Sequence, residues 1–451
     1  MKKLFLWLMV VTVAVSMVAA FSLSGCKEEE VATEEEAVAE EEAAPAEEAA
    51  EETQEENITI TFWGWGPIAE GVANVAAPAF TAEHPNVTVE VISMGPWDLM
   101  DKFYAAMVSG EGLPDSIMLV RRVMQKYLIS ELLYDFTDFV NVEHEGEFVE
   151  ALNSDVTSPD GKVLAVAADY GPSVLYYNSD LAESLGVNVE EIVTWDDYYN
   201  ICVEVGNKNP DIYLHQLAYP GGSWGTNYWR LWIQSAGLNI FDEEGKVILD
   251  NEELKEINGF FYKLHTDVNV IAAPVNDPSI YDAFREGKVL FWPGTSYRSM
   301  EIAQQVPEME GIITAVPWPL WSEDAPALCG NWGGAAMAVP KKGPNAEIAA
   351  EFIKFLTTNQ EVMTGIWLTS GGVPANAPIR ESILNMADSK TYATNLIESI
   401  AAREVPPWRY LDWQQTEKIL GDNLDAMMAG EVTPDEMWDN TEAQLVNILG
   451  R

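Results

Sequence analysis

The chain has 451 residues, with 72 acidic against 25 basic side chains and a net charge of −47 at pH 7. Such an excess of negative charge argues against nucleic acid, anionic lipid or a polyanionic ligand as a partner. The length exceeds the ~250–300 residues at which a single hydrophobic core stops growing, so the sequence predicts two domains or lobes.

The first 26 residues have the pattern of a secretory signal. Lys2 and Lys3 precede an apolar run over residues 4–21, and Leu23-Ser24-Gly25-Cys26 follows. This ending resembles a bacterial lipobox, and the resemblance implies that Cys26 is lipidated. The alternative is an uncleaved membrane anchor, although the run barely reaches the ~20 residues that a span needs. Either reading places the rest of the chain outside the cytoplasm, anchored in the periplasm or on the outer face of the plasma membrane.

Residues 27–56 contain 15 Glu and one Lys, with Ala and a single Pro between them. A segment of this composition cannot bury apolar area and repels itself, so we expect an extended, disordered tether.

Cysteine and histidine are sparse in the remaining 395 residues. Cys202 and Cys329 could form one disulfide outside the cell or remain as two buried thiols. The four histidines, at positions 84, 144, 215 and 265, show no paired spacing with cysteine. The sequence therefore predicts no metal site. It also lacks a phosphate-binding loop pattern, and we expect no cofactor.

The globular sequence begins with a strand at residues 58–62, where Ile58, Ile60 and Phe62 alternate with threonine. A helix at 68–83, a strand at 87–92, a helix at 97–109 and a strand at 116–120 follow. This βαβαβ order predicts a parallel sheet. Trp63-Gly64-Trp65-Gly66 ends the first strand, at the carboxyl end where ligands gather in open α/β sheets.

An ordered series of short motifs resembles the sugar-binding group of extracellular solute-binding proteins of ABC importers, which includes maltose-binding protein. The series covers residues 57 to about 440 and consists of Phe80 with Pro85-Asn86-Val87, Gly112-Leu113-Pro114-Asp115, Val174-Leu175-Tyr176-Tyr177-Asn178, Thr194-Trp195-Asp196-Asp197, Phe284 with Gly287-Lys288-Val289, Gly330-Asn331-Trp332-Gly333-Gly334 and Gly371-Gly372-Val373-Pro374. Phe291-Trp292 and Tyr297 depart from the residues that are usual in the family at those places.

The resemblance implies an α/β fold with two lobes, the type II periplasmic-binding-protein fold, in which each lobe is a central sheet flanked by helices. The N-terminal lobe would comprise residues 57–168 and 331–373, and the C-terminal lobe residues 169–330 and 374–451. Hinge crossovers would lie near 166–172, between 314 and 337, and at 371–374. The helices predicted after the last crossover, at 378–387, 391–401, 412–429 and 434–449, would pack on the second lobe.

A sugar presents apolar C–H faces ringed by hydroxyls, so its site needs flat aromatic surfaces and fixed polar groups. Of the chain's 16 tryptophans, 15 follow the signal, and several stand beside glycine in predicted loops. The candidates that combine these chemistries are Trp63, Trp65, Trp224, Trp292 and Trp332, with Tyr170 and Tyr297 as stacking residues that also carry hydroxyls, and Arg298 as a possible partner of a carboxylate or the ligand. Core packing is the alternative for each tryptophan, and a surface ion pair for Arg298.

Asp115 matches a family position whose carboxylate often accepts a hydrogen bond from a sugar hydroxyl. The alternative is a cap of a helix or turn.

Enzyme readings find less support. Gly221-Gly222-Ser223-Trp224-Gly225 fits the pattern of a hydrolase nucleophile elbow, but the required downstream order of an acid and then a histidine is missing, since only His265 follows. Because the chain has so many acidic residues, a pair of carboxylates for a glycosidase can always be proposed, and their presence does not indicate such an enzyme.

The sequence thus predicts a non-catalytic, lipid-anchored receptor that captures a carbohydrate, an oligosaccharide in our interpretation, between two lobes. It would act as a monomer and deliver the sugar to the transmembrane subunits of an ABC permease. The alternatives are an envelope glycan-active hydrolase and a glycan-binding adhesin with the same lobes.

Overall fold

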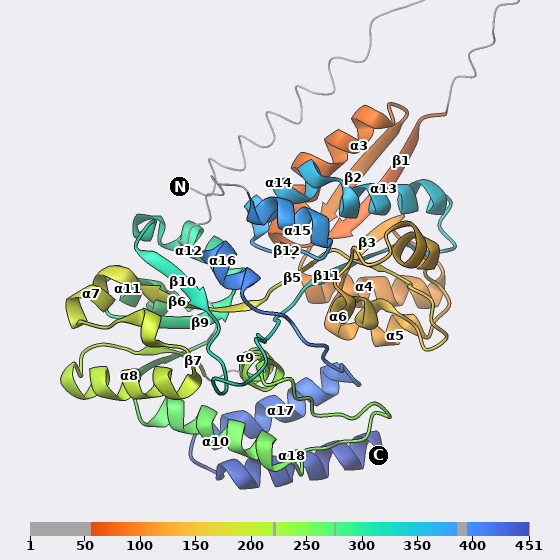
Figure 1. Cartoon of the computed structure of the whole chain (residues 1–451). Helices are drawn as coiled ribbons and strands as arrows, with labels where there is room; N and C mark the ends of the chain where they lie inside the picture. Colours follow the sequence, from red (N-terminus) through yellow and green to blue (C-terminus); the bar gives the residue numbers. More distant parts are fainter. Residues whose placement is uncertain (1–55, 220–221, 275–276, 386–394, 451) are drawn as a thin grey trace, which may run out of the picture. The chain divides into compact units, whose positions relative to one another are not determined.

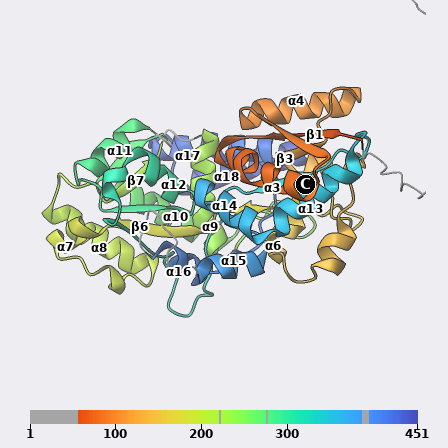
Figure 2. The ribbon, with the colours of Figure 1, turned by 90° about the horizontal axis from the view of Figure 1, so that it is seen from above.

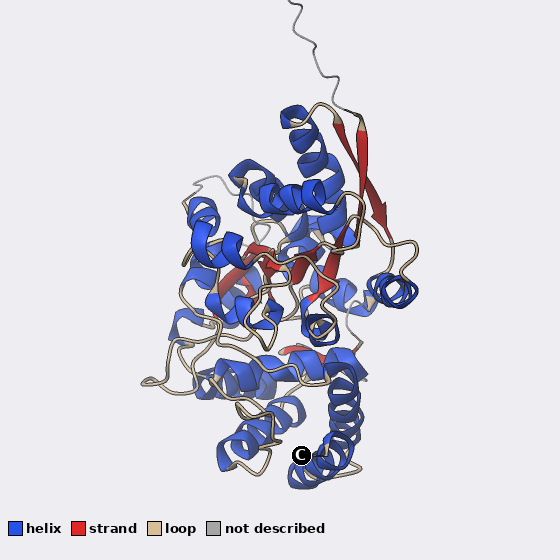
Figure 3. Cartoon of the chain, turned by 90° about the vertical axis from the view of Figure 1, so that its right-hand side faces the viewer, coloured by secondary structure: helices blue, strands red, loops and turns tan. Residues whose placement is uncertain are grey.

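The computed structural model describes residues 56–219, 222–274, 277–385 and 395–450 (Figure 1). The predicted signal segment, Cys26 and all of the acidic tether except its last residue lie outside these residues. Figure 3 shows the strands of the described part in red with helices packed around them.

The first sheet has five strands in the order β2 (Val87–Ser93), β1 (Ile58–Gly64), β3 (Ser116–Val120), β11 (Ala335–Ala338) and β4 (Val166–Ala167). Strands β2, β1 and β3 run parallel, as predicted, while β11 is antiparallel to β3 and β4. In β1, Ile60 and Phe62 are fully buried, and the Phe62 ring meets Phe352 edge-on with 6.1 Å between centroids.

Helices cover this sheet on both faces (Figure 2). They are α2 (Gly66–Gly71), α3 (Ala77–Glu83), α4 (Pro96–Ser109), α13 (Ala346–Thr358), α14 (Gln360–Ser370) and α15 (Ala377–Leu384), with the short α5 (Gln125–Leu128) and α6 (Glu150–Asn153) beyond β3. The predicted helix at 68–83 is helical throughout, but a π-helical turn at Val72–Ala76 joins α2 to α3. Short helical turns at Arg121–Val123 (η2) and Ser154–Val156 (η4) flank α5 and α6.

A second, antiparallel sheet has β6 (Ser173–Asn178) between β10 (Ile313–Pro317) and β9 (Phe291–Thr295), and a parallel pair joins β7 (His215–Ala218) to β8 (Val270–Ala273). The helices around these strands are α7 (Ser179–Leu185), α8 (Trp195–Lys208), α9 (Gly222–Ser235), α10 (Glu252–Thr266), α11 (Pro278–Arg285), α12 (Arg298–Gln305), α16 (Leu396–Ala401), α17 (Trp413–Met428) and α18 (Pro434–Leu449). Capping boxes at Thr194 and Thr433 fix the starts of α8 and α18, because each threonine and its acid three residues later satisfy free backbone N–H groups.

Two sequence expectations change. The glycines of Gly221-Gly222-Ser223-Trp224-Gly225 predict a loop there and a helix at residues 228–236, but helix α9 already begins at Gly222, so residues 222–225 form its first turn. Helix α15, predicted to pack on the second lobe, mainly contacts α14 and the short strand β12 (Val373–Pro374), and it touches the second sheet's surroundings through α16. Its apolar residues Ile379 and Ile383 are buried in the hydrophobic cluster that includes Ile60 and Phe62 of β1.

Three chain segments lie side by side between the two sheets, at residues 169–172, 331–334 and 373–374. Strand β5 (Asp169–Tyr170) pairs with β12, and Pro172 forms a β-bridge with Asn331. The Gly171 N–H donates to the Asn331 side chain at 2.9 Å, and the Trp332 N–H donates back to the Gly171 carbonyl at 2.9 Å. The exact lobe boundaries stay a prediction.

Cys202 and Cys329 are separate buried thiols, not a disulfide.

The buried carboxylate of Asp115 is expected to stabilise the fold. Its carboxylate accepts hydrogen bonds from the Thr61 N–H at 2.8 Å, the Thr61 hydroxyl at 3.0 Å and the Asn345 amide at 3.0 Å. Replacing Asp115 with alanine leaves three donors without this acceptor, and we expect the free energy of unfolding to fall by about 2–3 kcal/mol. Urea unfolding measures the change. Glu111→Ala, an exposed carboxylate nearby, serves as the control. A loss no larger than the control's would contradict this structural role.

We expect the buried side chain of His265 to make the stability of the protein depend on pH. The side chain is buried against Phe261 and His215, and burial lowers the pKa of His265 to about 4. In the unfolded chain a histidine has a pKa of about 6.5. Below that pH, unfolding is therefore accompanied by protonation of His265, which stays neutral in the folded protein until the pH approaches its lowered pKa. Stability should therefore be complete above pH ~6.5 and fall as the pH drops toward 4.

His265→Leu removes this linkage. We expect the difference in unfolding free energy between pH 7 and pH 4.5 to be smaller in the variant, by up to about 3 kcal/mol. Urea unfolding at both pH values tests it, and equal pH dependence in the two proteins would show that His265 does not carry the effect.

Candidate functional site

A cavity of about 280 Å³ opens at the carboxyl ends of the parallel strands β1, β2 and β3. We call it the tryptophan cavity after Trp65, Trp97 and Trp332, which line it. Trp65 follows β1, Trp97 begins α4 after β2, and Arg122 follows β3. The opposite wall comes from the end of β9 and from α12, and the crossover at residues 332–335 closes the cavity between them.

The aromatic rings differ in exposure. Trp97 is 40% exposed and Trp65 is half-buried, whereas Trp332 retains 8% of its surface. Trp65 adopts an extended backbone at the N-cap of α2, where Gly66 takes a positive φ of 57°. Because glycine accepts that conformation at little cost, the chain can turn sharply after β1 and leave the indole at the cavity wall.

Charged groups at the cavity occur in opposite pairs. Arg298 forms an ion pair with Glu301 one helical turn away, and its guanidinium carbon lies 4.8 Å from the centre of the Trp292 ring. Arg122 lies 5.3 Å from the Trp97 ring, and its Nε is 3.7 Å from a carboxylate oxygen of Glu417 in α17. The site thus presents guanidinium groups whose charge is largely compensated.

Tyr297 faces the cavity but its hydroxyl is already engaged. It donates to Oδ2 of Asp169 at 2.7 Å, while Oδ1 of Asp169 accepts the Ala335 N–H at 2.8 Å. Burial raises the pKa of Asp169, although its hydrogen bonds and Arg121 counteract the shift. Burial, with the neighbouring Asp169 charge, raises the pKa of Tyr297 well above its usual value. Tyr297 therefore offers its ring, rather than a free hydroxyl, to a ligand.

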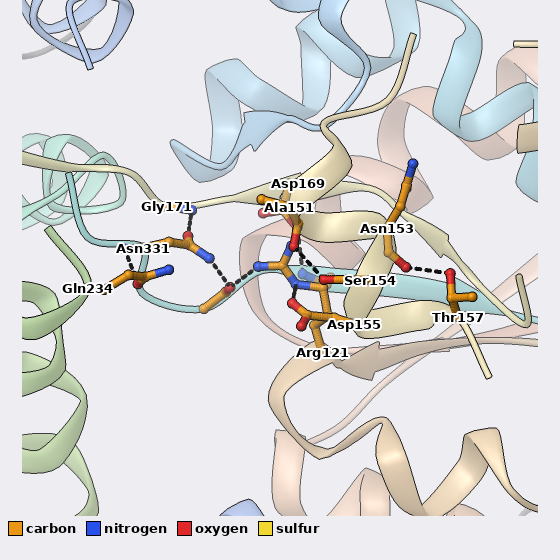
Figure 4. A network of polar contacts seen from close by, with 12 residues as sticks. Arg121, Ala151, Asn153, Ser154, Asp155, Thr157, Asp169, Gly171, Gln234 and Asn331 are labelled. Atoms are coloured by element: carbon orange, nitrogen blue, oxygen red, sulfur yellow. Dashed lines mark hydrogen bonds and ion pairs between the residues drawn. The ribbon is translucent and has the colours of Figure 1, made fainter. Parts of the chain in front are cut away.

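Gly334 makes the close approach at this junction possible. A Cβ there would lie 2.6 Å from the Asp169 carbonyl oxygen and 2.8 Å from Arg121, and the φ of 104° is one that side-chain-bearing residues rarely adopt. Figure 4 shows the surrounding network, in which Arg121, Asp169, Gly171 and Asn331 meet.

Four of the predicted site residues line the tryptophan cavity: Trp65, Tyr297, Arg298 and Trp332. Four others pack elsewhere. Trp63 is buried in β1 with the Lys102 ammonium 4.2 Å from its ring centre, and Trp292 is buried behind Arg298, donating to Gln216 at 2.9 Å. The Tyr170 hydroxyl accepts from Arg380, and Asp115 bonds Thr61 and Asn345. The side chain of Trp224 lies outside the described part of the structure.

Sequence reasoning missed Trp97, Arg122 and Glu301. The signal for the first two was available, since they follow the second and third predicted strands just as Trp65 follows the first. Glu301 has no such signal, because only the helical spacing from Arg298 brings it to the wall.

Within the described ranges, no cluster of three or more His, Cys, Asp and Glu side chains is arranged to hold a metal ion. No helix in those ranges is long and apolar enough to cross a membrane.

Comparisons with known proteins agree with this architecture. The profile of bacterial extracellular solute-binding proteins matches residues 43–363. The arabinooligosaccharide-binding protein of Bacillus subtilis is 23% identical over 406 residues, covering 86% of this chain and 91% of the relative.

Two solved structures share the fold at low identity. The sugar-binding protein MalE of Xanthomonas citri has a TM-score of 0.74 and 16% identity, with 87% of this chain and 98% of that chain covered. A binding protein of B. animalis subsp. lactis in complex with beta-1,6-galactobiose has a TM-score of 0.68 and 20% identity, with 86% and 97% covered. With its two-lobe α/β fold and the match across most of its length, the chain belongs to the bacterial extracellular solute-binding proteins.

Proposed function

We propose that this protein captures a neutral carbohydrate in the tryptophan cavity and delivers it to an ABC permease. The observation that carries the proposal is the grouping of Trp65, Trp97 and Trp332 with the Tyr297 ring around one cavity at the carboxyl ends of parallel strands. Aromatic faces stack on the apolar C–H faces of sugar rings, and this edge of an α/β sheet is where ligands bind.

The charges favour a neutral ligand. Arg298 is paired with Glu301, and Arg122 with Glu417, so neither guanidinium requires an anionic ligand for compensation. Both can still donate hydrogen bonds to hydroxyl oxygens. The volume of about 280 Å³ lies at the lower end of the range for small-molecule sites, which suits one or two sugar units. An oligosaccharide would extend beyond the cavity.

The relatives support a sugar as the ligand class. One is named for arabino-oligosaccharides, and a protein of similar fold was solved with a galactobiose. The two lobes, at 57–168 with 331–373 and at 169–330 with 374–451 apart from helix α15, would close on each other with the crossovers as the hinge. A ligand that touches both lobes would favour closure. Lipidation at Cys26 and the acidic tether would hold the protein outside the cytoplasm, as a monomer, near the permease.

A hydrolase on the same lobes is the alternative from another class. A glycosidase needs two carboxylates that flank the scissile bond. Among the described residues that line the tryptophan cavity, Glu301 is the only carboxylate, and it is bound to Arg298. The other alternative is an adhesin, whose melting temperature would not rise with a soluble sugar.

Incubation with a panel of neutral oligosaccharides, including arabino-, galacto- and malto-oligosaccharides, separates the three functions. A receptor raises its melting temperature with one class of sugar and leaves that sugar intact. Product formation would establish an enzyme, and the absence of any stabilisation across the panel would count against the receptor.

Trp65→Ala should weaken binding of the stabilising sugar about five- to 150-fold, because it removes an aromatic contact worth ~1–3 kcal/mol. Since Trp65 is half-buried, the melting temperature without ligand should change little. Trp292→Ala is the matched control: this indole is 1% exposed and packs behind the cavity, so its loss should cost ~3–5 kcal/mol of stability. Calorimetric titration and thermal unfolding measure both variants. Normal affinity in Trp65→Ala would remove Trp65 from the site.

Cys26→Ala should abolish acylation and membrane retention, because only a thiol at the mature first position can carry the thioether-linked lipid. Detergent phase partitioning and the intact mass of the purified chain report the outcome. Recovery of a processed, acylated Cys26→Ala protein would overturn the lipobox assignment.

A further inference from the structure

Two consecutive arginines follow β3, and they pair with carboxylates in different parts of the fold. Arg121 pairs with Asp155 of η4, with 3.3 Å between Nε and Oδ2. Arg122 pairs with Glu417 of α17, with 3.7 Å between Nε and Oε1. The two pairs have the same chemistry, but only the second contains a residue that lines the tryptophan cavity, namely Arg122.

The pair of Arg122 and Glu417 connects two hydrophobic clusters. Val120 and Val123, on either side of the arginines, are buried in the cluster that includes β1, whereas Leu420, one helical turn after Glu417, is buried in the cluster around α9. Helix α17 packs along α9 and also contacts η2 (Figure 1). On the lobe boundaries that the sequence predicts, residue 122 belongs to the N-terminal lobe and residue 417 to the C-terminal lobe, so the pair spans the two lobes.

Glu417 is buried and fixed in place. It is 4% exposed and is not part of the lining of the tryptophan cavity. Its Oε1 accepts a hydrogen bond from the Asn227 side chain of α9, and its backbone carbonyl accepts one from the Thr226 hydroxyl at 3.0 Å. A buried carboxylate needs partners that offset its desolvation, and Arg122 supplies the opposite charge. The carboxylate is therefore a fixed point against which the guanidinium lies.

Arg122 lies between this carboxylate and the tryptophan cavity. Its side chain is 11% exposed, and its guanidinium carbon is 5.3 Å from the centre of the Trp97 ring, within the range of a cation–π contact. The 3.7 Å between Nε and Glu417 is longer than a hydrogen bond, so this pair acts through charge. The contact uses the Nε side of the guanidinium, which leaves the Nη groups to donate to a hydroxyl oxygen in the cavity.

We infer that Glu417 is a positioning residue for the tryptophan cavity, which holds the Arg122 guanidinium beside Trp97 without touching the ligand. The inference rests on the proposed function, because it makes Arg122 a donor to the sugar. With the guanidinium held in advance, binding does not cost the conformational entropy of ordering a long side chain. Because Glu417 belongs to the other predicted lobe, Arg122 is held only while the lobes are together, and opening of the lobes releases it.

Fluorine NMR of the full chain labelled with 5-fluorotryptophan tests the positioning without any sugar. The Trp97 resonance is assigned by its disappearance in Trp97→Phe. Glu417→Gln removes the charge but keeps an acceptor for Asn227, and the Trp97 resonance should shift as the guanidinium leaves the ring. Arg122→Gln, which removes the guanidinium itself, should move the resonance in the same direction. An unchanged Trp97 resonance in Glu417→Gln would overturn the inference, whatever any sugar does.

Asp155→Asn is the matched control, because it removes the corresponding charge from the pair at the neighbouring position, Arg121. Neither member of that pair lines the tryptophan cavity. The Trp97 resonance should therefore stay at its position in the natural chain. A shift as large as that in Glu417→Gln would trace the effect to any loss of negative charge near the end of β3, and the assignment of Glu417 would be wrong.

A double-mutant cycle with the sugar that stabilises the protein tests the consequence for binding. In calorimetry, Glu417→Gln should weaken binding about two- to ten-fold, which corresponds to the cost of ordering one side chain. Because Glu417 acts through Arg122, the variant with both substitutions should bind no more weakly than Arg122→Gln alone. Additive losses would refute this. If no sugar of the panel binds, the proposed function fails, while the Trp97 resonance still decides whether Glu417 positions Arg122.

Discussion

The buried carboxylate of Asp169 is the interaction on which the rest of the site depends. It stands where three chain crossovers run side by side, and it accepts hydrogen bonds from the Tyr297 hydroxyl and the Ala335 N–H. A carboxylate can remain buried only when its oxygens are well satisfied, so the residues that satisfy it are held in place. Asp169 thereby ties the end of β9 to the start of β11 and sets the wall of the tryptophan cavity.

A second buried network continues from this junction. Arg230 donates to the Asn331 carbonyl at 2.7 Å and is enclosed by the rings of Trp408, Tyr410 and Trp413. Arg121 bonds the Gly333 carbonyl from the other side. Two guanidinium groups therefore hold the crossover at residues 331–334. Arg230 belongs to α9, and Arg121 follows β3.

Much of this architecture could be predicted from local sequence. The alternation in residues 58–62 and the helix predicted at 434–449 each depend on neighbouring residues, and the structure agrees with them. The start of α9 differs from the sequence prediction, because glycine is a poor helix former and tertiary contacts override the propensity of Gly222 and Gly225. The Gly222 N–H donates to Asp425, and the Thr226 hydroxyl donates to the Glu417 carbonyl.

The sequence by itself determined the class of fold, the order of the sheet-forming segments and the richness in tryptophan that suggests a sugar. Only the tertiary structure decided which tryptophans serve a cavity. Trp63 and Trp65 are two residues apart in the same strand end, yet one is buried under α4 and the other reaches the cavity wall. The reason is physical: an indole is equally suited to a core and to a ligand surface. Whether an indole lies in the core or at the cavity depends on which elements pack against each face of the sheet. Those elements come from distant parts of the chain, as does Glu417, the partner of Arg122.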